Sequence, residues 1–188
     1  MKFTYHGTPL EGFDAPYNNT ILNERAVELA VAFEWLKGRD SAHGLEVGNV
    51  LSHYGVTGHR VVDFYEKADG VENVDVFDIT GKFKWIVSIS TLEHVGWDAE
   101  PRDPDAAERA VEHLRSLLAP KGKMLITAPA GYNPSFDKFL KTGAGATRDA
   151  TMNRDKTDGW KQSKTRTFKP YGSSTPWAET VWIGEYGA

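Results

Sequence analysis

The sequence contains no cysteine, and this absence excludes disulfide bonds, thiolate metal sites and cysteine nucleophiles. It also lacks a long apolar run. The longest, at residues 29–36, is interrupted by Glu34 and is much shorter than the ~20 residues of a membrane-spanning helix. The N-terminal residues lack the apolar core of a signal peptide. We therefore expect a cytoplasmic protein with no membrane partner.

The chain has little excess charge of either sign. It carries 22 lysines and arginines against 26 aspartates and glutamates, a net charge of −4. Nucleic-acid-binding domains are usually basic, so this balance argues against a nucleic-acid carrier. Hydrophobic residues make up 40% of the chain and aromatic residues 12%, which is enough for a core and excludes global disorder. We expect a single domain over residues 1–188.

The spacing of apolar residues predicts helices that alternate with strands. Apolar residues recur at helical spacing from Ile21 to Leu36 and again over residues 105–118, where Pro104 and Asp105 provide a helix start. Such alternation is typical of an α/β fold with a mostly parallel sheet, here of about seven strands with helices on both faces. The predicted strands cover residues 44–47, 60–63, 74–78, 85–90, 124–127 and 180–186.

Polar residues follow the first four predicted strands, where ligands bind in open α/β sheets. A carboxylate after the second strand, at Asp63, can accept hydrogen bonds from both hydroxyls of a ribose. Asp78 and Ile79 after the third strand suit the edge and face of an adenine, and Gly48 allows close approach of the backbone. The predicted cofactor-binding residues are Glu46, Gly48, Asn49, Asp63, Asp78, Ile79 and Ser90.

Two motifs carry a family resemblance. Residues 85–94 form an apolar strand that leads into Ser-Thr-Leu-Glu-His, and residues 117–127 contain a leucine pair, Pro-Lys-Gly and a further strand. Together they resemble the class I S-adenosylmethionine (SAM)-dependent methyltransferases of the small-molecule type, over residues 45–132. The resemblance implies a three-layer Rossmann-like fold, with SAM as cofactor and S-adenosylhomocysteine (SAH) as product. It divides the chain into a lead and helix (1–43), a cofactor-binding core (44–132) and a substrate-side segment (133–188).

The first motif departs from the family pattern. The family has an acid followed by several glycines, whereas here Glu46 and Gly48 are followed by Asn-Val-Leu-Ser. The short distance from Glu46 to Asp63 leaves little room for the family's first helix. Glu66 is a second candidate for the ribose acid. The missing glycines also make a non-catalytic binding module an alternative to an enzyme.

The resemblance implies transfer of a methyl group to a hydroxyl of a small molecule or sugar by in-line displacement. His94 is the predicted general base because it follows the fourth strand and titrates near neutral pH; His53 is a weaker second candidate. Trp97 and Tyr132 are predicted to contact the substrate. No metal is predicted, because the six histidines show no ligand spacing.

A basic segment keeps one alternative substrate open. Residues 138–169, which we expect to form a loop, contain nine basic and three acidic residues and so carry a net charge of +6. Such a segment could bind phosphates, and it makes a nucleic-acid-directed methyltransferase the alternative to a small-molecule enzyme.

Overall fold

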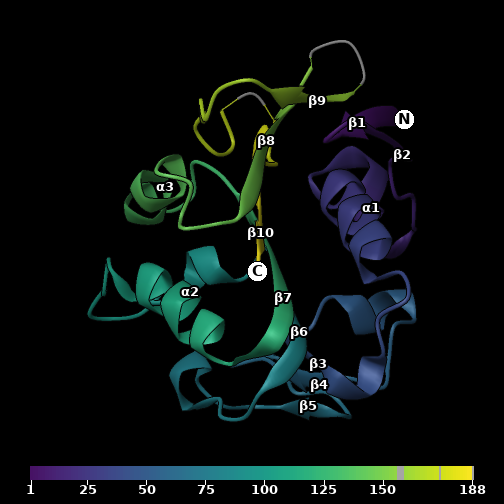
Figure 1. The fold of residues 1–188 in the computed structure, drawn as a ribbon. Coiled ribbons are helices and arrows are strands. Elements are labelled where there is room, and N and C mark those ends of the chain that lie inside the picture. The colour runs from purple at the N-terminus through teal and green to yellow at the C-terminus, as the bar shows by residue number, and fades with distance from the viewer. Residues whose placement is uncertain (156–158, 174, 188) are drawn as a thin grey trace.

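The computed structural model describes residues 1–155, 159–173 and 175–187, and an eight-stranded sheet runs through it (Figure 1). Five strands lie parallel to one another, and β10 runs antiparallel to its two neighbours, β7 and β8. From one edge to the other the strands are β5 (Val71–Glu72), β4 (Arg60–Val62), β3 (Gly44–Val47), β6 (Phe83–Ile89), β7 (Leu118–Pro129), β10 (Thr180–Tyr186), β8 (Arg148–Arg154) and β9 (Trp160–Ser163).

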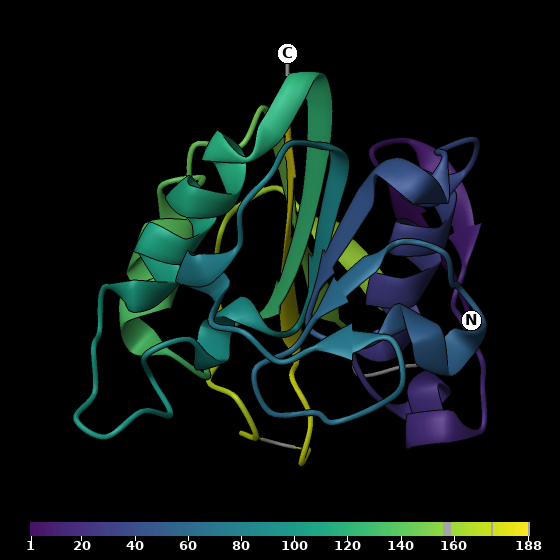
Figure 2. The ribbon, with the colours of Figure 1, turned by 90° about the horizontal axis from the view of Figure 1, so that it is seen from below.

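Helices cover both faces of this sheet, which confirms the predicted three-layer α/β fold. Helix α1 (Arg25–Leu36) lies on one face, with the hairpin of β1 (Lys2–Tyr5) and β2 (Thr8–Glu11) beside it. Helices α2 (Ala106–Ser116) and α3 (Pro134–Lys141) lie on the other face, and Figure 2 shows the sheet between the two layers. None of the described helices combines the length and the apolar composition that a bilayer crossing requires.

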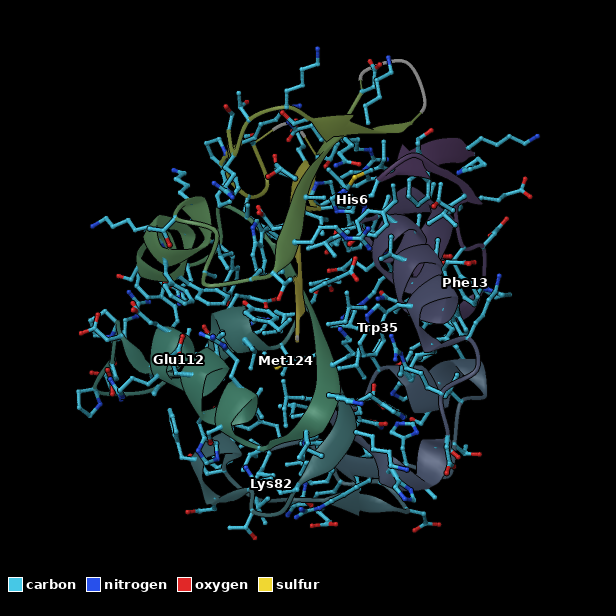
Figure 3. The ribbon with its side chains drawn as sticks, viewed as in Figure 1. His6, Phe13, Trp35, Lys82, Glu112 and Met124 are labelled. Atoms are coloured by element: carbon cyan, nitrogen blue, oxygen red, sulfur yellow. The ribbon has the colours of Figure 1, made fainter. Side chains whose placement is uncertain are left out.

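Each layer buries its own hydrophobic core against the sheet. Met124 of β7 is fully buried in the core shared with α2 and α3, whereas Trp35 packs against the core under α1 (Figure 3). Helix α2 presents an apolar stripe that includes Ala110 and Leu114, as its sequence spacing predicts. Burial at ~25 cal/mol per Å² of apolar surface makes such stripes the main source of stability.

The structure differs from the sequence prediction at residues 74–78 and in the basic segment. Strand β5 covers Val71–Glu72, and the predicted third strand at 74–78 is wrong because Asp75 caps a short 3₁₀ helix over Val76–Asp78. The side chain of Asp75 accepts a hydrogen bond from the N–H of Phe77. The basic segment is not a loop, since it contains the end of α3 together with β8 and β9. Helix α3 begins where the side chain of Asn133 accepts hydrogen bonds from two backbone N–H groups.

The strand order reverses between β3 and β6. From β3 the chain proceeds outward through β4 to β5, and then returns to place β6 on the other side of β3. A short 3₁₀ helix, Leu51–Tyr54, stands between β3 and β4 where an α-helix would otherwise pack, as the short spacing from Glu46 predicts. Ligand sites of open α/β sheets lie at such a reversal, beyond the carboxyl ends of the strands.

Candidate cofactor and substrate site

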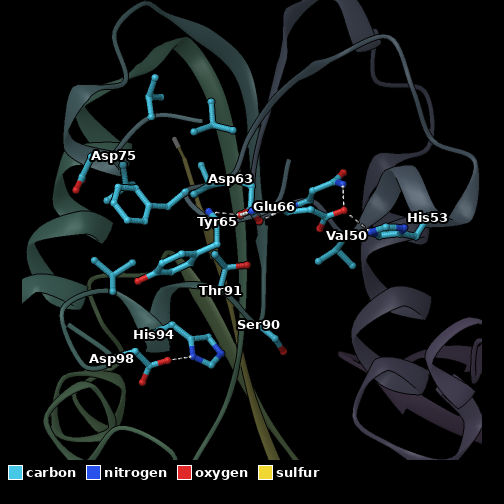
Figure 4. Close-up of a pocket in the computed structure, with 18 of the residues that line it drawn as sticks. Val50, His53, Asp63, Tyr65, Glu66, Asp75, Ser90, Thr91, His94 and Asp98 are labelled. Carbon is cyan, nitrogen blue, oxygen red and sulfur yellow. Dashed lines mark hydrogen bonds and ion pairs between the residues drawn. The ribbon is translucent and has the colours of Figure 1, made fainter. Parts of the chain in front are cut away.

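A pocket of about 690 Å³ opens at the point where the strand order reverses (Figure 4). Its walls come from the segments that follow β3, β4, β5 and β6, and from the start of α1. This volume falls within the ~300–1,000 Å³ of small-molecule sites. Of the predicted site residues, the pocket is lined by Gly48, Asn49, Asp63, Ser90 and His94.

Gly48 has a backbone conformation that requires glycine. Its φ is +88°, and an added Cβ would lie 2.0 Å from Oγ1 of Thr91. The N–H of Gly48 donates to the carbonyl of Val62 at 2.8 Å, which fixes the turn between β3 and β4. The single glycine that remains of the family motif therefore brings the chain close to the end of β6.

Glu46 stabilises the segment after β3 and does not line the pocket. Its side chain is fully buried. Oε1 accepts hydrogen bonds from the N–H groups of Val50 and Leu51, and Oε2 lies 2.8 Å from Nε2 of His59. Both carboxylate oxygens are thus occupied by the protein, so the structure does not bring Glu46 to a cofactor as the sequence predicts.

Asp63 and Glu66 have different roles after the end of β4. Asp63 accepts hydrogen bonds from three backbone N–H groups, those of Asn49, Tyr65 and Glu66, at 3.0, 2.8 and 2.8 Å. The resulting turn points Glu66 toward the pocket, where Oε1 lies 2.8 Å from Nδ2 of Asn49 and 3.1 Å from Nε2 of His53. Oε2 of Glu66 accepts no hydrogen bond from the described residues, so it is the carboxylate oxygen available to a ligand.

Asp78 and Ile79 lie outside the pocket, contrary to the sequence prediction. Ile79 is fully buried, and its carbonyl lies 3.0 Å from Nε2 of His113 on α2. The 3₁₀ helix that replaces the predicted strand shifts the pocket wall to Asp75 and Val76. The acid that follows the third strand in space is therefore Asp75.

Aromatic residues also line the pocket, and the sequence reasoning missed two of them. These two, Phe64 and Tyr65, follow Asp63 directly and are 58% and 71% exposed. Tyr17, which the sequence places among the residues that build the substrate pocket, lines it too, and its ring stacks on His53 with 4.5 Å between ring centroids. Two adjacent aromatic residues after the predicted ribose acid, Asp63, were the available signal, because exposed rings in a pocket offer a flat face to a base.

Beyond β6, three side chains form a connected hydrogen-bond network. Nδ1 of His94 lies 2.7 Å from Oδ2 of Asp98, and the hydroxyl of Tyr132 donates to Oδ1 of Asp98 at 3.0 Å. Burial and the hydrogen bond to Asp98 raise the pKa of Tyr132 to about 12. Tyr132 does not line the pocket itself, but its ring lies 4.7 Å from that of His94. Trp97 is outside the pocket and packs against the guanidinium of Arg102.

The start of α1 brings a positive charge to the pocket. Arg25 lines it, with Nη1 3.2 Å from Oε2 of Glu28 and 3.2 Å from the carbonyl of Ile89 at the end of β6. Ser90, with φ +44°, donates its hydroxyl to Oε1 of Glu28 at 2.6 Å. The buried Glu28 thus holds both Arg25 and Ser90 at the end of β6.

Four of the nine basic residues of segment 138–169 form ion pairs within the described part of the protein. Arg148 pairs with Glu185 at 2.6 Å, and Arg166 pairs with Asp149 at 2.7 Å. Lys161 and Lys169 also have acidic partners, Asp155 and Glu179, whereas Lys156 and Asp158 fall outside the described residues. Asp149 and Asp155 are already counted in the +6, so only the pairs with Glu185 and Glu179 lower the charge left for a phosphate backbone, to 6 − 2 = +4. The described residues also contain no group of three or more side chains able to hold a metal ion.

No protein-family model and no curated protein matches the sequence. Solved structures do match the fold. The N-methyltransferase NodS from Bradyrhizobium japonicum WM9, in complex with SAH, has a TM-score of 0.56 at 12% identity, over 87% of this chain and 86% of that chain. A SAM-dependent methyltransferase from Thermotoga maritima, described as a possible histamine N-methyltransferase, has a TM-score of 0.52 at 13% identity, over 86% of this chain and 89% of that chain. The chain therefore has the class I methyltransferase fold that its motifs predict.

Proposed function

We propose that the protein is a SAM-dependent methyltransferase that transfers a methyl group to a hydroxyl of a small molecule or sugar by in-line displacement. The observation that carries this proposal is the pocket between the ends of β3 and β6. Acids from successive strand ends line the same pocket as His94, on a fold shared with methyltransferases.

The donor set of the pocket fits the separate parts of SAM. Glu66 offers a carboxylate oxygen to the ribose hydroxyls, and the exposed ring of Tyr65 offers a face to the adenine. In this proposal Asp75, which also lines the pocket, contacts the edge of the adenine. Arg25 provides the positive charge that the carboxylate of the methionine part needs. In this proposal Gly48, Asn49 and Ser90 complete the cofactor site.

When bound, SAM supplies a methyl group that is already activated on a sulfonium. The protein then has to hold the acceptor in line, which contributes ~7–11 kcal/mol to catalysis, and has to remove the acceptor's proton. His94 removes this proton. Asp98 accepts the hydrogen bond from Nδ1–H of His94, which leaves Nε2 of His94 to take the proton of the acceptor hydroxyl. Tyr132 orients Asp98.

Calorimetric titration with SAM and SAH tests the proposal. We expect saturable heat with both compounds, and SAH formation once a suitable hydroxyl acceptor is present. An absence of heat at high micromolar ligand, with a protein that is folded by circular dichroism, would overturn the assignment of the cofactor.

One observation favours a second candidate, a binding module without catalysis. The backbone N–H groups of Asn49, Val50 and Leu51 all donate to carboxylates of the chain itself, so the loop after β3 has fewer donors for a ligand. The same titration separates the candidates when it is followed by a turnover assay. A module of this kind binds SAH and forms none from SAM.

A further inference from the structure

Glu28 is a fully buried acid of α1 that the proposed reaction does not use. Its Oε1 accepts hydrogen bonds from the hydroxyl of Ser90, at 2.6 Å, and from the hydroxyl of Thr127 in β7, at 2.8 Å. Its Oε2 lies 3.2 Å from Nη1 of Arg25. Glu28 thus joins the start of α1 to the segment after β6 and to β7, and these contacts compensate for burial of its charge.

The contact with Glu28 uses only one side of the guanidinium group of Arg25. Nη1 donates to Oε2 of Glu28 and to the carbonyl of Ile89, both at 3.2 Å. Nε and Nη2 form a second edge of the guanidinium, and no atom in the described part of the chain accepts a hydrogen bond from either. The Arg25 side chain is only 16% exposed and lines the pocket. A nearly buried cation with an unpaired edge beside a pocket indicates a site for an anionic group of a ligand.

Two other arginines show what the same edge does elsewhere in this protein. Nε and Nη2 of Arg60 contact both carboxylate oxygens of Glu72, at 2.9 and 2.7 Å. The same two atoms of Arg166 contact both oxygens of Asp149, at 2.7 Å each. Such planar, bidentate pairing is the strong mode by which arginine binds a carboxylate. In Arg25 the equivalent edge has no carboxylate from the described residues.

We propose that Glu28 is a positioning residue, which holds Arg25 so that its Nε and Nη2 bind the carboxylate at the amino-acid end of the cofactor. This inference rests on the proposed function, because the carboxylate in question is that of SAM. Glu28 does not line the pocket, so it touches neither cofactor nor acceptor and acts through Arg25. Through Oε1 it also connects Arg25 to Ser90, in the segment that leads from β6 to His94.

Two effects of Glu28 on Arg25 oppose each other. The negative charge of Glu28 partly neutralises the guanidinium and so weakens its attraction for a second carboxylate. The hydrogen bond from Nη1 to Glu28, however, immobilises a long side chain that otherwise has many rotamers. Without Glu28 the charge of a nearly buried guanidinium has no carboxylate partner, so the side chain turns toward the solvent and away from the cofactor. We therefore expect the positioning effect to dominate.

Calorimetric titration with SAH and with decarboxylated SAH, which differs only in lacking the carboxylate, tests the proposal. We expect the wild-type protein to bind SAH about 10–100-fold more tightly, the usual contribution of hydrogen bonds to a charged group. In Glu28→Gln, which keeps the shape and removes the charge, this ratio should fall about tenfold, because Arg25 regains its rotamer freedom. Affinity for decarboxylated SAH should change by about twofold at most, since that compound does not use Arg25. A merely structural role would weaken both compounds alike and leave the ratio unchanged.

Thr127→Val is the matched control. It removes the hydroxyl that donates to Oε1 and leaves the contact between Oε2 and Arg25, so the ratio should keep its wild-type value. In an Arg25→Ala background, Glu28→Gln should have no further effect on the ratio, because the two residues act in series. If Glu28→Gln does not fold by circular dichroism, Glu28→Asp replaces it. Its shorter side chain withdraws the carboxylate from Arg25, so the ratio should fall in this variant too.

Three results would overturn the role of Glu28: an unchanged or increased ratio in the folded Glu28 variant, an equal fall in Thr127→Val, or an effect that persists in the Arg25→Ala background. Equal binding of the two compounds by the wild-type protein would also overturn it and would leave the cofactor assignment intact. A folded wild-type protein that binds neither compound would instead contradict the proposed function, and with it the inference that rests on it.

Discussion

Nδ1 of His94 lies 2.7 Å from Oδ2 of Asp98, and this carboxylate also accepts a hydrogen bond from the hydroxyl of Tyr132. The contact fixes the ring and leaves Nε2 to act on an acceptor. We expect His94→Ala to lower kcat by ~10²–10⁴-fold, the usual contribution of a general base. The affinity for SAH, measured by calorimetry, should change by about twofold at most, because the base acts on the acceptor.

Tyr132→Phe is the control variant for this prediction, with a smaller expected loss of kcat. It keeps the ring beside His94 and removes the hydrogen bond to Asp98, so kcat should fall by less than in His94→Ala. Unchanged turnover in His94→Ala would remove the assignment of the base, whatever the result for Tyr132.

Asp63 and Glu66 should give opposite results when their charges are removed. Glu66→Gln alters the carboxylate that is open to the ribose, so SAH affinity should fall by ~10–100-fold, since a hydrogen bond to a charged group contributes ~1.5–3 kcal/mol. Stability in urea should change little, because Glu66 is partly exposed.

Asp63→Asn should instead lower the free energy of unfolding by ~1–3 kcal/mol, since one of three backbone N–H groups loses its acceptor. Urea denaturation and SAH titration of both variants test whether Asp63 stabilises the fold and Glu66 binds the cofactor. If Asp63→Asn leaves stability intact and Glu66→Gln leaves affinity intact, the roles assigned to the two acids are wrong.

Gly48 and Gly55 form a matched pair for testing the turn after β3. Both have positive φ, +88° and +83°, but an added Cβ at Gly55 meets nothing within 4 Å, whereas at Gly48 it meets Thr91. Gly55→Ala should therefore cost ~1–2 kcal/mol of stability, the price of a left-handed residue. Gly48→Ala should cost a further ~1–3 kcal/mol from overpacking and should weaken SAH binding. Equal loss of stability by urea denaturation would show that contact with Thr91 is unimportant.

The sequence predicted the fold well where local pattern and long-range packing agree. Apolar runs located β3, β6 and β10, and helical spacing located α2. It failed at residues 74–78, where alternating valines suggested a strand and the cap at Asp75 produced a 3₁₀ helix. It also missed α3, although Asn133 before Pro134 is a helix-start signal.

The candidate site was harder to predict, because the role of an acid depends on its partners in space. Glu46 lies at the end of β3 and Asp63 follows β4, and both accept hydrogen bonds from the loop after β3. Nothing local to the sequence distinguishes Glu66, which faces the pocket, from such residues. The burial of Glu93 has no local sequence signal, since it depends on residues distant in the chain that pack around it.

Glu93 makes the stability of the protein depend on pH in a direction that can be tested. Burial raises its pKa in the folded state well above the ordinary ~4.3 of a glutamate in the unfolded chain. Below pH ~4.3 both the folded and the unfolded protein hold the proton, and Glu93 does not make stability depend on pH. As the pH rises above ~4.3, the unfolded chain releases the proton while the folded protein keeps it. The free energy of unfolding then falls by at most ~1.4 kcal/mol per pH unit for this one group.

Glu93→Gln removes this dependence. The variant should match the wild-type protein in urea denaturation at about pH 4, and it should become progressively more stable than wild type toward neutral pH. Glu24 also has a pKa raised by burial and by Glu28, but it is present in both proteins and cancels in the difference. A stability difference that stays constant with pH would mean that Glu93 is charged in the folded protein.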